Sequence, residues 1–452
     1  MPGRTTLLVS IVAAVLCAPA NMADYRAGSL AKQEVQPIYS ADPQDPWNRI
    51  FYLLFTRTVK LRLSEDFKGE GAVAPTEVMG NPSLLVTSRT VERIESGDRA
   101  IDPLYPNFFS SKGSEPILTD PGFSELKDAL QDACAESSPR PPLQRALMQS
   151  DIWAAYEIVA WSRRTEGLIG DHARALLPWF ARFIAKLALS SREIAALPHN
   201  YAVAQSSLSL PQVFDAGSGW MEVEWSPGRS HDEMAGNRHA ARIFLKPHEN
   251  PALFLKQVNQ RFRKGQDPLP GGIRDLDAEV LLTQVLLIDR ARRVVPSALI
   301  SDIQLRTITR DQSGRFRGSN LEEFELSRQL MLRDAASGGF VHRTADEPSY
   351  LPASGNDFTF ASPMIGEGEP KPPILGTLRR RCESCHFESA VFTFNMIRIP
   401  GRPVPAVRQL RPEGDQRAFS VANKKMKSKE FQSLQLDGAP PRPAESVPNG
   451  RN

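Results

Sequence analysis

Two cysteines and one histidine lie within five consecutive residues near the C-terminal end of the chain. Residues 382–386 read Cys-Glu-Ser-Cys-His. Two thiols at this spacing can form a redox disulfide, supply half of a zinc site, or be merely structural. With 4 cysteines and 7 histidines among 452 residues, chance predicts roughly 0.0005 copies of the C-x-x-C-H pattern per chain. The pentapeptide is therefore the most specific chemical signal in the sequence.

The same five residues resemble the haem-attachment signature of c-type cytochromes. The resemblance implies that Cys382 and Cys385 form thioether bonds with the two vinyl groups of a porphyrin. It also implies that His386 is the proximal ligand of the iron. One haem c, attached outside the cytoplasm and cycling between Fe(II) and Fe(III), would then carry electrons. The resemblance covers the pentapeptide alone and implies no cytochrome c fold for the rest of the chain.

In that family a methionine or a second histidine usually supplies the opposite axial ligand. Two methionines follow His386, at positions 396 and 426. Met426 lies in a Lys-Lys-Met-Lys segment that a loop could deliver to the iron, so it is the candidate distal ligand. Met396 fits core packing better. Core packing is also the commoner role for Met426.

Two further functions fit the same residues. A haem with an open sixth site and a nearby polar group, such as His231 or an arginine, would be a peroxidase or an oxidase. Without haem, a disulfide between Cys382 and Cys385 would leave an extracytoplasmic interaction protein. The arginines at 379–381 could neutralise haem propionates or dock an acidic redox-partner protein, although a solvated basic turn is the commoner explanation. His231 and His239 both lie in a polar stretch, where an exposed loop position is expected.

The first twenty residues have the pattern of a cleaved secretory signal. Arg4 precedes a mostly apolar stretch over 7–17, and Ala-Pro-Ala follows at 18–20. We expect cleavage near the end of this segment and a periplasmic or otherwise extracytoplasmic location. The bulky Leu16 directly before Cys17 fits a lipidation site poorly, so a lipid anchor is disfavoured. The three cysteines that remain are too few for a disulfide-stapled scaffold.

Composition excludes several classes of protein. The chain has 55 Lys and Arg against 52 Asp and Glu, a net charge of +3, which argues against binding nucleic acid through global electrostatics. No apolar run of transmembrane length follows the first twenty positions, so no membrane span is expected after signal removal. The sequence contains no nucleophile elbow, phosphate-binding glycine loop or nucleotide fingerprint. Its 37 prolines predict many irregular connections rather than a helical bundle.

Hydrophobic spacing predicts the elements that must position the motif. Apolar residues recur at helical spacing over 143–159 and 176–187, and Ser190 followed by Glu193 has capping-box spacing for a third, short helix. From Met221 onwards the period drops to two, which is typical of a strand with one wet face. Further predicted elements are strands at 241–246, 280–288 and 303–308, and a helix from Asn320 to Met331.

These patterns predict an α+β fold in which a helical subdomain accompanies an antiparallel or mixed sheet. A loop-rich C-terminal segment carries the haem motif. The expected divisions are a signal peptide (1–20), a loop-rich N-terminal region with short strands such as 59–63 (21–130), a helical subdomain (131–214), an α+β domain (215–335), the haem-motif segment (336–436) and a disordered tail (437–452).

Overall fold

The computed structural model describes most of the body of the chain. The described residues are 38–58, 62–63, 76–77, 85–86, 99–101, 120–162, 168–224, 239–264, 266, 272–344, 348–351, 374–377, 406–409, 416–432 and 434. The predicted signal peptide, the pentapeptide 382–386 and the predicted tail lie outside them.

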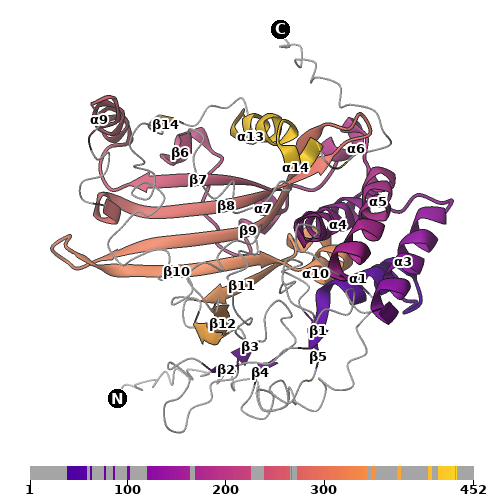
Figure 1. The fold of residues 1–452 in the computed structure, drawn as a ribbon. Coiled ribbons are helices and arrows are strands. Elements are labelled where there is room, and N and C mark those ends of the chain that lie inside the picture. The colour runs from indigo at the N-terminus through magenta and orange to yellow at the C-terminus, as the bar shows by residue number, and fades with distance from the viewer. Residues whose placement is uncertain are drawn as a thin grey trace, which may run out of the picture.

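The centre of the molecule is a seven-stranded sheet in the order β11-β10-β9-β8-β7-β6-β14, with every neighbouring pair antiparallel (Figure 1). Except at β14, neighbours in the sheet are also neighbours in sequence. The strands are β6 (Met221–Glu224), β7 (His239–Pro247), β8 (Leu276–Ile288), β9 (Val294–Arg310), β10 (Phe316–Leu326), β11 (Phe340–Thr344) and β14 (Ala406–Gln409). The α+β class is therefore confirmed.

Strand β8 is apolar because both of its faces are covered. Val280 and Leu282 belong to one buried cluster, whereas Leu281 between them belongs to another. Successive side chains of a strand point to opposite faces, so these clusters lie on the two sides of the sheet. A strand buried on both faces has a near-continuous apolar sequence, which is what 280–288 shows.

Helices gather at one end of this sheet, where α1, α3, α4 and α5 pack together (Figure 1). Their shared core includes the fully buried rings of Trp47, Trp153 and Phe183, and it reaches Ile288 at the end of β8. The helices are α1 (Pro46–Phe55), α3 (Asp120–Ala135), α4 (Pro142–Ser162), α5 (Leu168–Leu187), α6 (Ser191–Ala195), α7 (Asn200–Ala204), α9 (Pro251–Arg263), α10 (Arg328–Arg333), α13 (Gln416–Met426) and α14 (Lys429–Gln432).

The predicted capping box at the start of α6 is confirmed. The Ser190 side chain accepts a hydrogen bond from the backbone N–H of Glu193, and the Glu193 carboxylate accepts one from the backbone N–H of Ser190. Each side chain thus satisfies a backbone donor that the helix itself cannot. Arg145 of α4 also pairs with Glu193, which fixes α6 against the longer helix.

The helix predicted from Asn320 to Met331 is wrong over its first half. Residues up to Leu326 belong to β10, and only Arg328–Arg333 is helical. β10 is paired on both sides, with β9 and with β11. Two ladders of interstrand hydrogen bonds outweigh the helical preference of a segment rich in Leu and Glu.

Short strands complete the described part of the chain. β1 (Thr56–Thr58) pairs with β5 (Arg99–Ile101), and β3 (Thr76–Glu77) pairs with β4 (Leu85–Val86). A three-stranded sheet has the order β12-β13-β2, formed by β12 (Pro348–Leu351), β13 (Ile374–Thr377) and β2 (Arg62–Leu63).

Candidate functional site

The motif segment lies between two paired strands. The chain enters it from β13, the middle strand of the three-stranded sheet, and leaves it into β14, at the edge of the seven-stranded sheet. Cys382 follows Thr377, the last residue of β13, by five residues. The motif thus begins directly after the small sheet in sequence.

The N-terminal part of the chain helps to hold the strand that leads to the motif. β2 pairs with β13 in parallel, with Arg62 opposite Ile374 and Leu63 opposite Leu375. This pairing joins residues that are some 310 positions apart in sequence. The two-residue β2 overlaps the strand predicted at 59–63.

Of the predicted iron ligands, Met426 alone falls within the described residues. It is the last residue of α13, is half-buried, and packs against the cluster that contains Trp153 and Phe431. This environment favours the core-packing role. Cys382, Cys385 and His386 lie outside the described residues, as do Met396, His231 and the arginines at 379–381.

His239 was expected in an exposed loop, and the structure corrects this. It is the half-buried first residue of β7, and its Nε2 atom lies 3.3 Å from the Ser301 Oγ atom of β9. The Ser301 hydroxyl donates to the carbonyl of Thr283, on the strand between them. Lys425 of α13 is 6% exposed, and its ammonium donates to the carbonyl of His239. The helix that follows the motif segment is thereby bonded directly to the central sheet.

A band of carboxylates across β9 and β10 was not predicted from the sequence. Glu323 and Glu325 are 1% and 2% exposed, and Glu325 lies opposite the half-buried Asp302. The Gln304 amide donates to Asp302 and to Glu323, at 3.4 Å in each case. In the sequence, Glu323 and Glu325 alternate with Phe324 and Leu326, and this pattern could have indicated a strand with both carboxylates on one face. Over the described ranges, no group of three or more His, Cys, Asp or Glu side chains is arranged to hold a metal ion.

Cys134, in α3, contrasts with the motif cysteines. It is half-buried, forms no disulfide, and packs against the helical core. Burial raises the pKa of its thiol, and a protonated thiol is a poor nucleophile and a poor metal ligand. Cys134 therefore serves as packing and offers a control for cysteine chemistry elsewhere in the chain.

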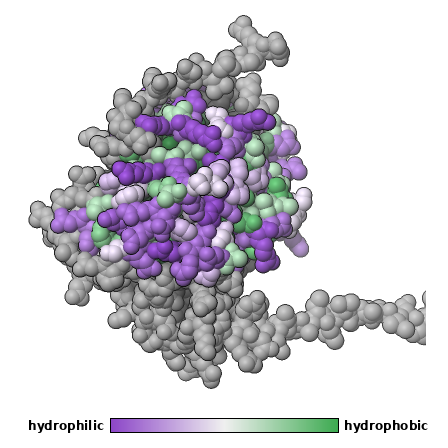
Figure 2. Space-filling view, turned by 90° about the vertical axis from the view of Figure 1, so that its right-hand side faces the viewer, coloured by the Kyte–Doolittle hydropathy of each residue, from purple (hydrophilic) through white to green (hydrophobic). Residues whose placement is uncertain are grey.

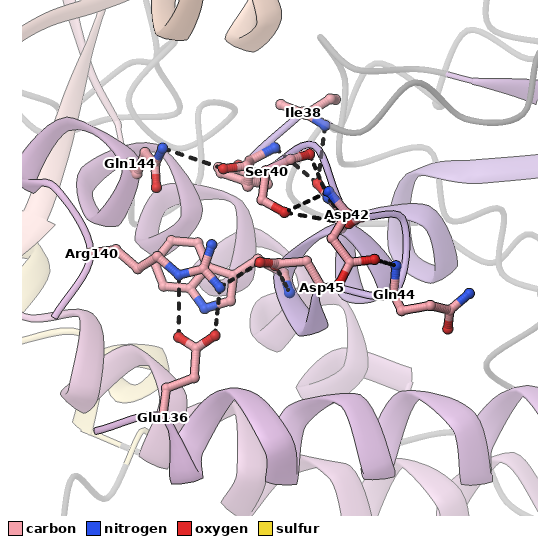
Figure 3. Close-up of polar contacts among 11 residues, drawn as sticks. Ile38, Ser40, Asp42, Gln44, Asp45, Glu136, Arg140 and Gln144 are labelled. Atoms are coloured by element: carbon pink, nitrogen blue, oxygen red, sulfur yellow. Dashed lines mark hydrogen bonds and ion pairs between the residues drawn. The ribbon is translucent and has the colours of Figure 1, made fainter. Parts of the chain in front are cut away.

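A second polar network fixes residues 38–48 on the helices (Figure 3). The Arg140 guanidinium pairs with Asp45 at 2.7 Å and with Glu136 at 2.5 Å. It also lies 4.7 Å from the centre of the Trp47 ring. The Asn48 side chain accepts the backbone N–H groups of residues 38 and 39. Every one of these contacts is internal, so this network is architectural.

The helical end of the molecule presents a mainly hydrophilic surface. Figure 2 shows hydrophobic residues scattered singly or in small groups among hydrophilic ones on this face. Scattered apolar side chains are normal on a protein surface and do not define an interaction site. Among the described helices, none is long and apolar enough to span a bilayer.

Comparisons with known proteins give no family. No protein-family model matches the chain, and no match was found among the curated proteins or the solved structures.

Proposed function

We propose that this chain is an exported protein that carries one covalently attached haem c and transfers electrons through its Fe(II)/Fe(III) couple. The Cys-Glu-Ser-Cys-His sequence at 382–386 carries the proposal. In it, Cys382 and Cys385 are the thioether anchors and His386 is the proximal ligand. Export to an extracytoplasmic compartment follows from the signal-like segment 1–20 and agrees with haem attachment outside the cytoplasm.

The described flanks of the motif are paired strands. β13 before it and β14 after it are each hydrogen-bonded into a sheet. Thioether bonds keep a porphyrin attached even where its pocket is shallow, so the motif needs no deep cavity. The arginines at 379–381 are next to the first anchor in sequence and would neutralise the propionates or steer an acidic redox partner by long-range attraction.

Retention of haem under denaturing conditions tests the proposal. The full chain is expressed with haem-attachment machinery, denatured in detergent, and examined for haem absorbance and intact mass. We expect the mass of the polypeptide to rise by about 600 Da, the mass of one haem. A double substitution, Cys382→Ala with Cys385→Ala, should abolish attachment. Cys134→Ala, which removes a packed thiol outside the motif, should leave it unchanged.

The same measurements separate the alternatives. A colourless polypeptide whose mass is lower by two hydrogen atoms, in Cys134→Ala as in the wild type, would establish a disulfide between the motif cysteines and overturn the haem proposal. A haem that binds carbon monoxide rapidly when reduced has an open sixth site and belongs to a peroxidase or oxidase. A six-coordinate spectrum that resists carbon monoxide is the result expected of an electron carrier.

A further inference from the structure

Two helices on the outside of the sheet are free of acidic residues. α9 (Pro251–Arg263) and α13 (Gln416–Met426) contain no Asp or Glu. Both pack on β7, α9 also contacts β14, and Figure 1 shows the two helices beside β14 at the top of the view. The inner face of α9 is apolar, since Phe254 and Val258 cluster with Ile243 and Leu245 of β7. The polar residues of α9 are thereby turned away from the sheet.

Six cations whose described side chains are exposed or half-buried lie on or directly after these helices, and we call them the basic surface: Lys256, Arg261, Arg263, Lys264, Lys424 and Lys427. Five of them are exposed, and Arg261 is half-buried. Of the ion pairs in the described part of the chain, none involves any of the six. Lys425, the neighbour that is buried, is instead bonded to the sheet. Among the described residues, the basic surface thus gathers six cations without a carboxylate partner, on a chain whose net charge is only +3.

Exposed apolar side chains accompany these cations. Leu253, in the first turn of α9, is 47% exposed, and Phe419 of α13 is 48% exposed. Within the described ranges, three large hydrophobic side chains are at least 40% exposed, and the third is Val203 of α7, at 40%. Each of the two helices therefore presents one exposed apolar side chain. Cations and single apolar side chains on the outer face of a helix suit the headgroup region of a bilayer.

We propose that the basic surface docks on a membrane surface that contains anionic phospholipids. Four of its six cations are lysines, which are depleted at protein–protein interfaces, where arginine and aromatic residues are enriched. The lysine ammonium is a flexible point charge, and a lipid surface requires no shape complementarity. Negatively charged lipid attracts each nearby lysine enough to raise partitioning about fivefold. This inference does not depend on haem.

Vesicle sedimentation of the full chain tests the proposal. The vesicles consist of phosphatidylcholine with or without phosphatidylglycerol. We expect binding only to the anionic vesicles and release at high salt, because screening weakens exposed charges. A quadruple charge reversal, Lys256→Glu, Lys264→Glu, Lys424→Glu and Lys427→Glu, should lower the partition coefficient by more than about 100-fold.

Charge reversals elsewhere provide the matched control. Lys127→Glu in α3 with Arg333→Glu in α10 places two reversals away from the basic surface (Figure 1), and Lys256→Glu with Lys424→Glu places the same number on it. The control should bind anionic vesicles within about twofold of the wild type, whereas the second pair should bind more than about 20-fold more weakly. Equal binding to both kinds of vesicle, or unchanged binding of the quadruple variant, overturns the proposal. Failure to bind vesicles combined with salt-sensitive binding to polyglutamate would assign the basic surface to an acidic protein instead.

Discussion

Arg328 donates two hydrogen bonds to the carboxylate of Asp151, from Nε to Oδ2 at 3.1 Å and from Nη2 to Oδ1 at 2.5 Å. Asp151 is 0% exposed and Arg328 is 6% exposed. The Tyr39 hydroxyl donates to the same Oδ2 atom at 3.4 Å, and burial raises the pKa of that hydroxyl well above its usual value. One buried carboxylate thus joins α4, α10 and the segment before α1.

Substitution of Arg328 with Met should strongly destabilise the protein. It removes the cation that compensates a buried carboxylate, and breaking a buried pair from one side costs about 3–5 kcal/mol of unfolding free energy. Urea denaturation measures the difference. Arg49→Met is the control, because Arg49 pairs with the exposed Asp132 at 3.0 Å and such pairs contribute at most about 1 kcal/mol. Equal losses in the two variants would contradict the assigned role of the buried pair.

Glu193 should contribute a pH-dependent part of the stability. Hydrogen bonds from the Ser190 backbone N–H, then from the Ser190 hydroxyl and Arg145, lower the pKa of Glu193 from 4.5 to about 2. Because the folded-state pKa is the lower one, this stabilisation is present above pH 4.5 and is lost as the pH falls towards 2. We expect Glu193→Gln to be less stable than the wild type at neutral pH, and the gap between them to close on acidification.

Denaturation of both proteins at several pH values measures that gap. Ser190→Ala provides a graded comparison, since it removes the hydroxyl but keeps the backbone donor. The difference in unfolding free energy between Ser190→Ala and the wild type should also shrink in acid, but by less than the difference for Glu193→Gln. A gap between wild type and Glu193→Gln that stays constant from neutral pH to pH 2 would refute the role of the carboxylate.

Two glycines with nearly the same φ angle should respond differently to alanine. Gly338 has φ +80°, and a Cβ there would lie 2.6 Å from the Cβ of Ala204 and 2.7 Å from the carbonyl oxygen of Asn200. Gly314 has φ +79°, with no atom within 4 Å of such a Cβ. Gly314→Ala should cost about 1 kcal/mol for the left-handed backbone alone, and Gly338→Ala about 2–4 kcal/mol because overpacking is added.

Thermal or urea unfolding of the two glycine variants measures this difference. Similar losses would mean that α7 can move away from Gly338 at little cost. The comparison therefore reports how firmly α7 is held against the turn that leads into β11.

The packing of Met426 predicts that it is not required as an iron ligand. Met426→Leu keeps most of the side-chain volume but removes the sulfur atom, so the visible spectrum that the proposed haem gives in the reduced state should not change. Met426→Ala should lower the unfolding free energy by about 1–2 kcal/mol, a reduced value for a half-buried position. If Met426→Leu made the iron five-coordinate and reactive towards carbon monoxide, Met426 would be the distal ligand after all.

Local signals in the sequence predicted local structure well. The Ser190 and Glu193 spacing predicted a cap whose partners are three residues apart. The alternation that begins at Met221 predicted a strand, and the apolar run 280–288 predicted another. Helix α9 was missed, although Asn250 directly before it accepts the N–H groups of Ala252 and Leu253 as a capping residue does.

Features that depend on distant partners were not predictable from the pattern. Leu321 and Phe324 have helical spacing, but β9 and β11 make their segment a strand. The pairing of β2 with β13 and the burial of Glu323 and Glu325 likewise depend on chain far away in sequence. The candidate site shows the same contrast. The pentapeptide can be recognised from five consecutive residues, whereas the pairing of the strands that flank it in sequence is evident only from the fold.

The position of β14 has a consequence for biogenesis. Ala406 to Gln409 pair with Glu224 to Met221, so the central sheet acquires its last strand only when nearly the whole chain has emerged. A nascent chain that ends before this point exposes the outer backbone of β6, and bare edges of this kind recruit other chains. Premature termination between the 382–386 motif and β14 would therefore produce an aggregation-prone species rather than a shorter working protein.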